Sequence, residues 1–188
     1  RDGWHSRYTV VRVITPDMPF VTDSVLMALS HDGLVVHHLG NVVLSTDRDD
    51  EGTVRALSTD RTWSRREVFI YAEIDRLPDA ELTDLENRLE TALADVRAAV
   101  ADFTAMKLKL AELRDELAAA PPPLPADEIE EVLAFLNWLP RNGFTFLGYR
   151  SFDYADDTIR QSDVQNLGVM RNRRTATPRR LSEQPEEV

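Results

Sequence analysis

The chain has 188 residues, of which 43% are hydrophobic, enough for one domain with an appendage or for two small domains. Its formal net charge of -11 argues against a general nucleic-acid or anionic-membrane binder, because both need a cationic face. It has no cysteine, and no apolar run approaches the ~20 residues of a membrane span. We therefore expect a cytoplasmic protein and, from the start at Arg1 and the polar end, a piece of a longer one.

The first predicted unit is a strand followed by a helix. Tyr8 to Thr15 carry apolar residues on both faces, which is typical of a central strand covered on both sides. In the turn that follows, Asp17 is expected to cap the helix and Pro19 to lie in its first turn. The helix is predicted from about Val21 to His31, and its buried stripe consists of Val21, Val25, Ala28 and Leu29.

Two more strands are predicted before the long helical region. Residues 34–44 form the second strand, in which Gly40 indicates a bulge or the close approach of another backbone or a ligand. Residues 45–64 are polar and predict a loop. In the third strand, Glu67 to Asp75, one face is apolar, while Phe69 and Tyr71 lie between acids on a half-exposed surface or an interface.

The next segment is helical, because no glycine or proline occurs between Pro78 and Pro121. Its leucines recur near the 3.5-residue period of a coiled-coil seam, which either one long helix or a helical hairpin satisfies. We favour a hairpin with a break capped by Asp102 or Thr104.

The remaining elements follow a stiff Pro-rich linker at residues 121–126. A helix starts at Asp127 and ends before Pro140, and a strand-like segment runs from Phe144 to Phe152. Its aromatics, together with Trp138, are expected in a core or between domains. The arginines of residues 171–188 predict a solvated tail.

The order of elements predicts an α+β fold. Strand, helix, strand, strand, helix and a possible fourth strand at residues 144–152 form the βαββαβ ferredoxin-like arrangement, an antiparallel sheet with helices on one face, here extended by extra helices. We divide the chain into residues 4–120 with the helical hairpin, the linker 121–126, a helix-plus-strand segment 127–170 and the polar tail 171–188. Residues 127–170 either complete the first sheet or start a second domain.

Two separated segments resemble a known family. Residues 8–25, YTVVRVITPDMPFVTDSV, closely resemble the N-terminal region of large bacterial NAD-specific glutamate dehydrogenases. Residues 135–139, 142–150 and 167–169 resemble a later part of the same region. The resemblance implies an ACT-like fold for residues 4–120, in modules that pair and often sense amino acids. It also implies a parent enzyme that uses NAD to deaminate L-glutamate oxidatively to 2-oxoglutarate and ammonia.

The residues themselves predict no catalysis in this chain. A dinucleotide site needs the spacing G-x-G-x-x-G, and no two glycines stand two apart. His37 and His38 are adjacent on a strand, so they point to opposite faces and cannot chelate one metal together. We expect no catalytic residue, no metal and no cofactor here, with NAD bound elsewhere in the parent.

The best candidate site is the turn after the first strand. In ACT-type domains this turn and the helix start hold an effector's carboxylate through free backbone N–H groups. The resemblance places the effector site at Thr15, Asp17, Met18, Phe20, Thr22, Asp23 and Ser24. Effector-binding ACT domains commonly have glycine directly after the proline, whereas this chain has Phe20. The turn is therefore either an effector site or purely structural.

Three functions follow from these observations. The preferred one is a non-catalytic regulatory or oligomerisation segment of a large NAD-specific glutamate dehydrogenase. Its expected partners are a second copy, other domains of the parent and an amino-acid effector, but no nucleic acid and no membrane. The alternatives are a free-standing amino-acid sensor of the ACT type and a helical scaffold built on Leu82 to Leu117.

Overall fold

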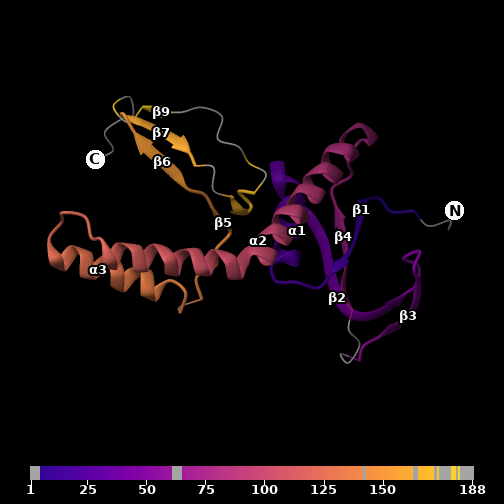
Figure 1. Cartoon of the computed structure of the whole chain (residues 1–188). Coiled ribbons are helices and arrows are strands. Elements are labelled where there is room, and N and C mark those ends of the chain that lie inside the picture. The colour runs from indigo at the N-terminus through magenta and orange to yellow at the C-terminus, as the bar shows by residue number, and fades with distance from the viewer. Residues whose placement is uncertain are drawn as a thin grey trace. The chain divides into compact units, whose positions relative to one another are not determined.

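The computed structural model describes residues 5–60, 65–141, 143–162, 165–171, 173, 179–180 and 182. The chain divides by its contacts into two compact units, Arg1–Val96 and Arg97–Val188. The first unit contains β1 (Thr9–Pro16), α1 (Val21–Leu29), the 3-10 turn η1 (His31–Gly33), β2 (Val36–Arg48), β3 (Val54–Ser58) and β4 (Arg66–Ile74). Helix α2 (Asp79–Ala119) begins in the first unit and ends in the second, which also contains α3 (Ala126–Trp138), β5 (Gly148–Tyr149), β6 (Phe152–Ala155), β7 (Thr158–Gln161), β8 (Leu167–Gly168) and β9 (Arg179–Arg180) (Figure 1).

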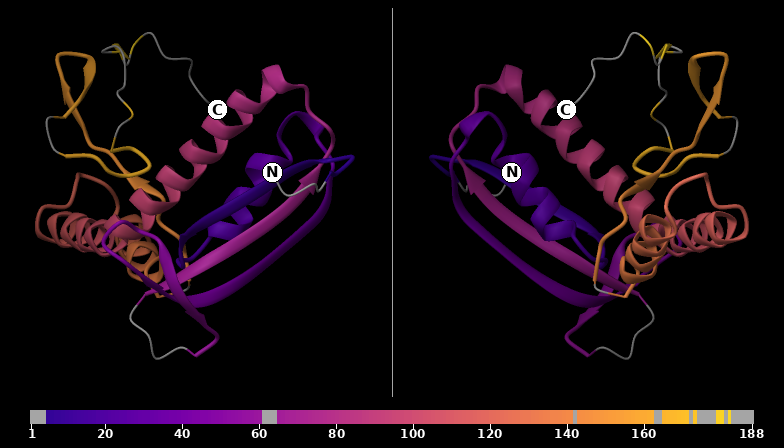
Figure 2. Two further views of the ribbon diagram at one scale, coloured as in Figure 1. Left: turned by 90° about the vertical axis from the view of Figure 1, so that its right-hand side faces the viewer. Right: turned by 90° about the vertical axis from the view of Figure 1, so that its left-hand side faces the viewer.

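The first unit is a layer of helix on an antiparallel sheet. Among the described residues, its four strands are ordered β1-β4-β2-β3, and every neighbouring pair is antiparallel. Figure 2 shows α1 and the first half of α2 on the same side of this sheet. The predicted α+β fold of ferredoxin-like type, with helices on one face, is confirmed.

The core of this unit lies between the helices and one face of the sheet. The predicted stripe of α1 is buried, and Val25 and Leu29 are fully buried. Burying a side chain of this size contributes about 1.5–3 kcal/mol. The sheet and α2 contribute further buried apolar side chains: Val13, Val68, Ile70, Ala72, Ile74, Leu85, Leu89 and Val96.

Strand β1 lies at an edge of the sheet, so the prediction of a central strand covered on both sides was wrong. Its described neighbour is β4 on one side. Val13 is 8% exposed on the helix side, whereas Ile14 is 54% exposed on the other face. Both faces of β1 carry apolar residues, but only the face toward the helices is buried.

The predicted loop at residues 45–64 contains regular structure. Strand β2 continues to Arg48, and β3 pairs with it as a hairpin. The polar turn between them is closed by Asp49, whose carboxylate accepts the N–H of Thr53 at 2.7 Å. The bulge expected at Gly40 is also misplaced, because the register shifts between Val36 and His38 while Gly40 pairs regularly with Tyr71.

The expected fourth strand does not join this sheet in the described part of the chain. Within residues 144–152, β5 pairs with β8 and Phe152 begins β6, which pairs with β7. These partners are close in sequence and lie in the second unit, so local pairing replaces the long return to β1.

Helix α2 is one continuous helix rather than the expected hairpin. Asp102 caps no helix break. Its carboxylate instead accepts the backbone N–H of Gly168 at 2.8 Å and forms an ion pair with Arg171. Thr104 likewise lies inside the helix. The two compact units divide within α2, and not at the linker of residues 121–126.

In the second unit α3 contacts the C-terminal part of α2. Arg114 of α2 donates a hydrogen bond to the side-chain oxygen of Asn137 at 3.1 Å. Of the aromatics expected in a core or an interface, Trp138 is 48% and Phe144 52% exposed. Most of the tail predicted at residues 171–188 lies outside the described residues, but Arg171 is not a free solvated cation, because it pairs with Asp102.

Candidate functional site

In the turn predicted as an effector site, Asp17 contacts β4 and does not cap α1. Its carboxylate forms an ion pair with Arg66 of β4 at 3.1 Å, and its backbone N–H donates to the Arg66 carbonyl at 3.0 Å. The N-cap of α1 is Phe20, and no side chain caps the helix. The prediction that Asp17 caps α1 was therefore wrong, as was the placement of Pro19 in the first turn, because α1 starts only at Val21.

Two of the other predicted effector residues, Thr22 and Ser24, already make hydrogen bonds within the protein. The Thr22 hydroxyl accepts a hydrogen bond from Asn41 of β2 at 3.3 Å, and the Ser24 N–H donates to the Phe20 carbonyl at 2.9 Å. Met18 is half-buried and Asp23 is exposed. Thr15 differs from these, because it is 3% exposed and its hydroxyl has no hydrogen-bond partner among the described residues.

Phe20 adopts a backbone conformation that glycine favours. Its φ of 70° and ψ of -4° lie in the left-handed region, where the side chain of an L-residue is strained. The ring is 49% exposed, so it is not inserted in the core. Phe20 thus occupies a backbone conformation that suits glycine better than an L-residue.

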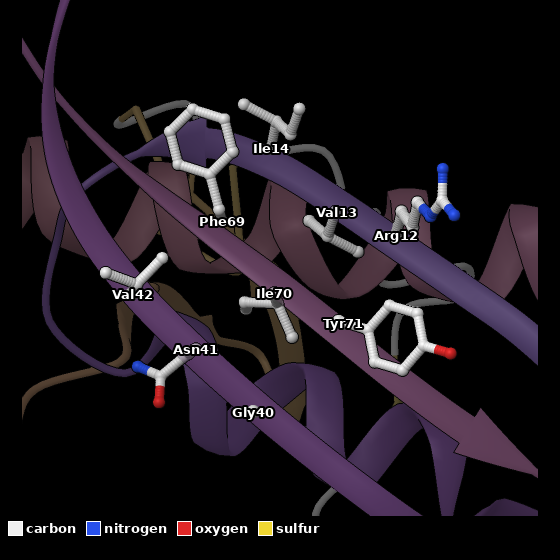
Figure 3. Close-up of a pocket in the computed structure, with 9 residues that line it drawn as sticks. All are labelled: Arg12, Val13, Ile14, Gly40, Asn41, Val42, Phe69, Ile70 and Tyr71. Atoms are coloured by element: carbon white, nitrogen blue, oxygen red, sulfur yellow. The ribbon is translucent and has the colours of Figure 1, made fainter. Parts of the chain in front are cut away.

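The sheet face opposite the helices is the second candidate site. Side chains of the same face meet in rows across three strands, because Ile14 pairs with Phe69 and Phe69 with Val42 in the antiparallel register. Figure 3 shows the Ile14, Phe69 and Tyr71 side chains on the viewer's side of the sheet, with helices behind. A hollow of about 430 Å³ opens on this part of the sheet. It is lined by Arg12, Val13, Ile14, Gly40, Asn41, Val42, Phe69, Ile70 and Tyr71. We call the side of the sheet that carries Ile14, Phe69 and Val42 the open face.

Polar groups border the apolar row of the open face. Tyr71, in the row of Arg12, donates a hydrogen bond to Glu73 at 2.6 Å. This bond raises the pKa of the Tyr71 phenol, so Tyr71 stays a neutral donor at ordinary pH. Arg12 is exposed at the β1 edge. The open face thus combines an apolar centre with fixed polar neighbours, as protein contact surfaces do.

A buried carboxylate stabilises the end of this face near the β2–β3 hairpin. The Glu67 side chain is 4% exposed and pairs with Arg48 at 2.7 Å and with Arg65 at 3.0 Å. The hydrogen bonds from Arg48 lower the pKa of Glu67, burial opposes this, and Arg65 adds to the lowering. Glu67 is therefore an anion that joins β4 to β2.

The second unit contains a comparable buried carboxylate at Asp102. Burial raises its pKa, but the Gly168 N–H and the Arg171 guanidinium outweigh burial, so the pKa lies below its usual range. With these contacts made inside the unit, Asp102 connects α2 to β8 and to the turn after it. It has the environment of a structural anion.

The two adjacent histidines lie at the register shift of β2, where simple alternation of faces does not hold, and they make separate contacts. His37 contacts Asp75 at 2.7 Å and stacks on Tyr8 with 4.3 Å between ring centroids. His38 is exposed, with its ring centroid 6.0 Å from that of Tyr71. Across the described part of the chain, no group of three or more His, Asp or Glu side chains is placed to hold a metal ion. None of the described helices combines the length and apolar character needed to cross a membrane.

Sequence reasoning located half of the open face. The alternation in residues 67–75 placed Phe69 and Tyr71 on a half-exposed surface, and both side chains are half-buried there. Ile14 was missed because its strand was interpreted as covered on both sides, and Val42 was missed because neither face of the second strand was assigned. The available signal was Arg12, a charge on the same face as Ile14 that a covered central strand would not accommodate easily.

Comparison with known proteins shows what the first unit is similar to. Residues 1–89 match the family model described as "Glutamate dehydrogenase, ACT1 domain". Over these residues the chain is similar to the ACT1 domain of glutamate dehydrogenases. This confirms the resemblance to the N-terminal ACT-like region of NAD-specific glutamate dehydrogenases, and the matched residues include both candidate sites.

Two relatives extend the similarity beyond the ACT1 domain. The chain is 41% identical over 161 residues to the NAD-specific glutamate dehydrogenase of Pseudomonas aeruginosa, which covers 84% of the chain and 10% of that relative. It is 41% identical over 179 residues to the NAD-specific glutamate dehydrogenase of Halomonas elongata, which covers 90% of the chain and 11% of that relative. The chain thus spans about a tenth of the length of these relatives.

Proposed function

We propose that this chain is a non-catalytic regulatory and oligomerisation segment of a large NAD-specific glutamate dehydrogenase. The parent enzyme would deaminate L-glutamate oxidatively to 2-oxoglutarate and ammonia, with NAD bound outside these 188 residues. Two relatives named NAD-specific glutamate dehydrogenase, each about ten times as long as the matched part, support the assignment.

The observation that carries the proposal is the exposed apolar row of the open face. Ile14 is 54% and Val42 50% exposed, and half-buried Phe69 lies between them. An apolar row of this kind, bordered by polar groups, marks a surface that another protein covers. The ACT1 domain would use it to contact a second copy or another domain of the parent.

The proposal is tested by adding a charge to the open face. Val42→Glu places a carboxylate in the apolar row, and Met27→Glu places one on α1, where Met27 is 75% exposed and away from the row. Sedimentation of the 188-residue chain should show self-association that Val42→Glu weakens by at least about tenfold, the effect of ~1.4 kcal/mol. Met27→Glu should associate like the unchanged chain.

Two results would contradict the proposal. One is dehydrogenase turnover by the 188 residues alone, which would make the segment catalytic. The other is equal association of the Val42→Glu and Met27→Glu variants, which would remove the open face as the contact surface.

One observation favours amino-acid sensing as a second function. The buried Thr15 hydroxyl lacks a partner among the described residues and belongs to the turn where ACT-type effectors bind. A thermal-shift panel of the common amino acids, run with the unchanged chain and with Phe20→Gly, tests it. A ligand that binds only the folded chain stabilises it by about 2.7 kcal/mol at a hundredfold excess over its dissociation constant. No shift in either protein would leave assembly as the function.

The helical-scaffold alternative has less support. Leu85, Leu89 and Val96 of the proposed seam are buried against the sheet of the same unit. This part of α2 is therefore already occupied by its own domain. The exposed Leu108 and Leu113 lie in the other half of the helix.

A further inference from the structure

The outer edge of β1 carries backbone groups that point away from its partner strand β4. The backbone N–H of Asp17 donates to the carbonyl of Arg66 in β4. The antiparallel register is regular from Thr9 to Pro16, so the backbone groups of the other odd-numbered residues of β1 also point toward β4. Because backbone groups alternate in direction along a strand, the N–H and C=O groups of Val10, Arg12 and Ile14 point away from β4. No described strand pairs with them.

A groove lies beside this edge. It has a volume of about 400 Å³ and runs between β1 and the first half of α2, both in the first unit. Its helix wall consists of Leu82, Leu85, Glu86, Leu89, Glu90 and Leu93. Free strand edges invite pairing with another strand. Leu85 and Leu89 of this wall are buried, whereas Leu82 is 38% exposed and Leu93 half-buried, so the latter two offer apolar surface to such a strand.

The groove occupies the position of a strand that the described part of the fold lacks. In the βαββαβ arrangement a last strand follows the second helix and extends the sheet. Here that place lies on the free side of β1 and beneath α2, and β5 and β6 do not fill it in the described structure. The sheet is otherwise completed on its far side by β3.

Two acidic side chains of the groove, Glu86 and Glu90, indicate which kind of strand can bind there. Glu86 and Glu90 are exposed, and neither forms an ion pair within the residues that the structure describes. If β1 paired with β1 of a second copy around a two-fold axis, these acids and both Arg12 side chains would face their own counterparts. A strand with alternate apolar residues and a Lys or Arg opposite the two acids fits better.

We propose that the free edge of β1 and the groove under α2 receive an extended strand from the part of the parent polypeptide outside these 188 residues. The strand places apolar side chains on Leu82 and Leu93 and a basic side chain at Glu86 and Glu90, and it completes the sheet. The source of the strand rests on the proposed function, because only a longer parent supplies it. The relatives, about ten times as long as the matched region, leave ample chain for it.

Amide hydrogen exchange compares the full-length parent with the 188-residue chain. The amides of Val10, Arg12 and Ile14 should exchange at least about tenfold more slowly in the parent, since paired amides need local opening to exchange. The double variant Glu86→Lys and Glu90→Lys of the parent should lose much of this protection. Asp84→Lys, an exposed α2 position that does not line the groove, is the matched control and should keep it.

Each outcome decides the proposal. Equal exchange of the three amides in both proteins would overturn it. Protection that appears in the 188-residue chain as its concentration rises would overturn it in favour of a second copy. A third outcome is that Val42→Glu and Met27→Glu associate equally while the three β1 amides stay protected in the parent. This would remove the open face as the assembly surface and would leave the strand-binding edge of β1 supported.

Discussion

At the scale of single residues, Phe20 joins the sheet to α1 in a strained conformation. The left-handed region costs an L-residue about 1–2 kcal/mol, and glycine occupies it freely. Phe20→Gly and Phe20→Ala both remove the ring, so their difference isolates the backbone term. We expect Phe20→Gly to have a free energy of unfolding about 1 kcal/mol higher than Phe20→Ala in urea denaturation. Greater stability of Phe20→Ala would show that the turn carries no such strain.

Glu67 makes the stability of the ACT1 domain depend on acid. Its folded-state pKa lies below the ordinary value of 4.5, first because of the Arg48 hydrogen bonds. The folded state therefore gains stability from the ionised form above the unfolded-state pKa and loses it as the pH falls through the folded-state pKa. Glu67→Gln should lower the free energy of unfolding at pH 7 by about 1–3 kcal/mol and weaken its dependence on pH below 5.

The control for this prediction is Glu51→Gln, because Glu51 is an exposed acid of the β2–β3 turn. Urea denaturation across pH 3 to 7 should show the acid-dependent loss in Glu51→Gln as in the unchanged chain. An unchanged pH dependence in Glu67→Gln would assign the acid sensitivity to other carboxylates.

At the scale of elements, a glycine lets β8 approach β5 closely. Gly168 has a φ of 59°, and a Cβ atom there would lie 2.2 Å from the Leu147 carbonyl oxygen. Gly143 has a φ of 69° with open space around its Cβ position, so Gly143→Ala measures the backbone strain alone. We expect Gly143→Ala to cost about 1 kcal/mol and Gly168→Ala about 3 kcal/mol or more in the unfolding of the second unit. Similar costs would mean that β5 and β8 separate without penalty.

At the scale of the whole molecule, a net charge of -11 opposes self-association. Contact through the open face is apolar, so salt should strengthen it by screening the repulsion. Between 0.1 and 1 M salt the Debye length falls from about 10 Å to about 3 Å. We expect sedimentation to show that the self-association constant of the unchanged chain rises over this range of salt. The Val42→Glu variant should associate weakly at every salt concentration. Association that weakens with salt would indicate that ion pairs form the contact.

The sequence by itself determined the strands β1, β2 and β4, the helical character of residues 79–119, the buried stripe of α1 and the ferredoxin-like fold, since hydrophobic period and turn residues are local properties. Only the tertiary structure decided which apolar faces are covered. The pattern of β1 shows two apolar faces, but its place at the edge follows from where residues 144–152 pair. Likewise, Asp17 and Asp102 each had the character of a helix cap, and distant arginines gave them other roles. Pairing and burial depend on partners remote in sequence, and local periodicity carries no information about them.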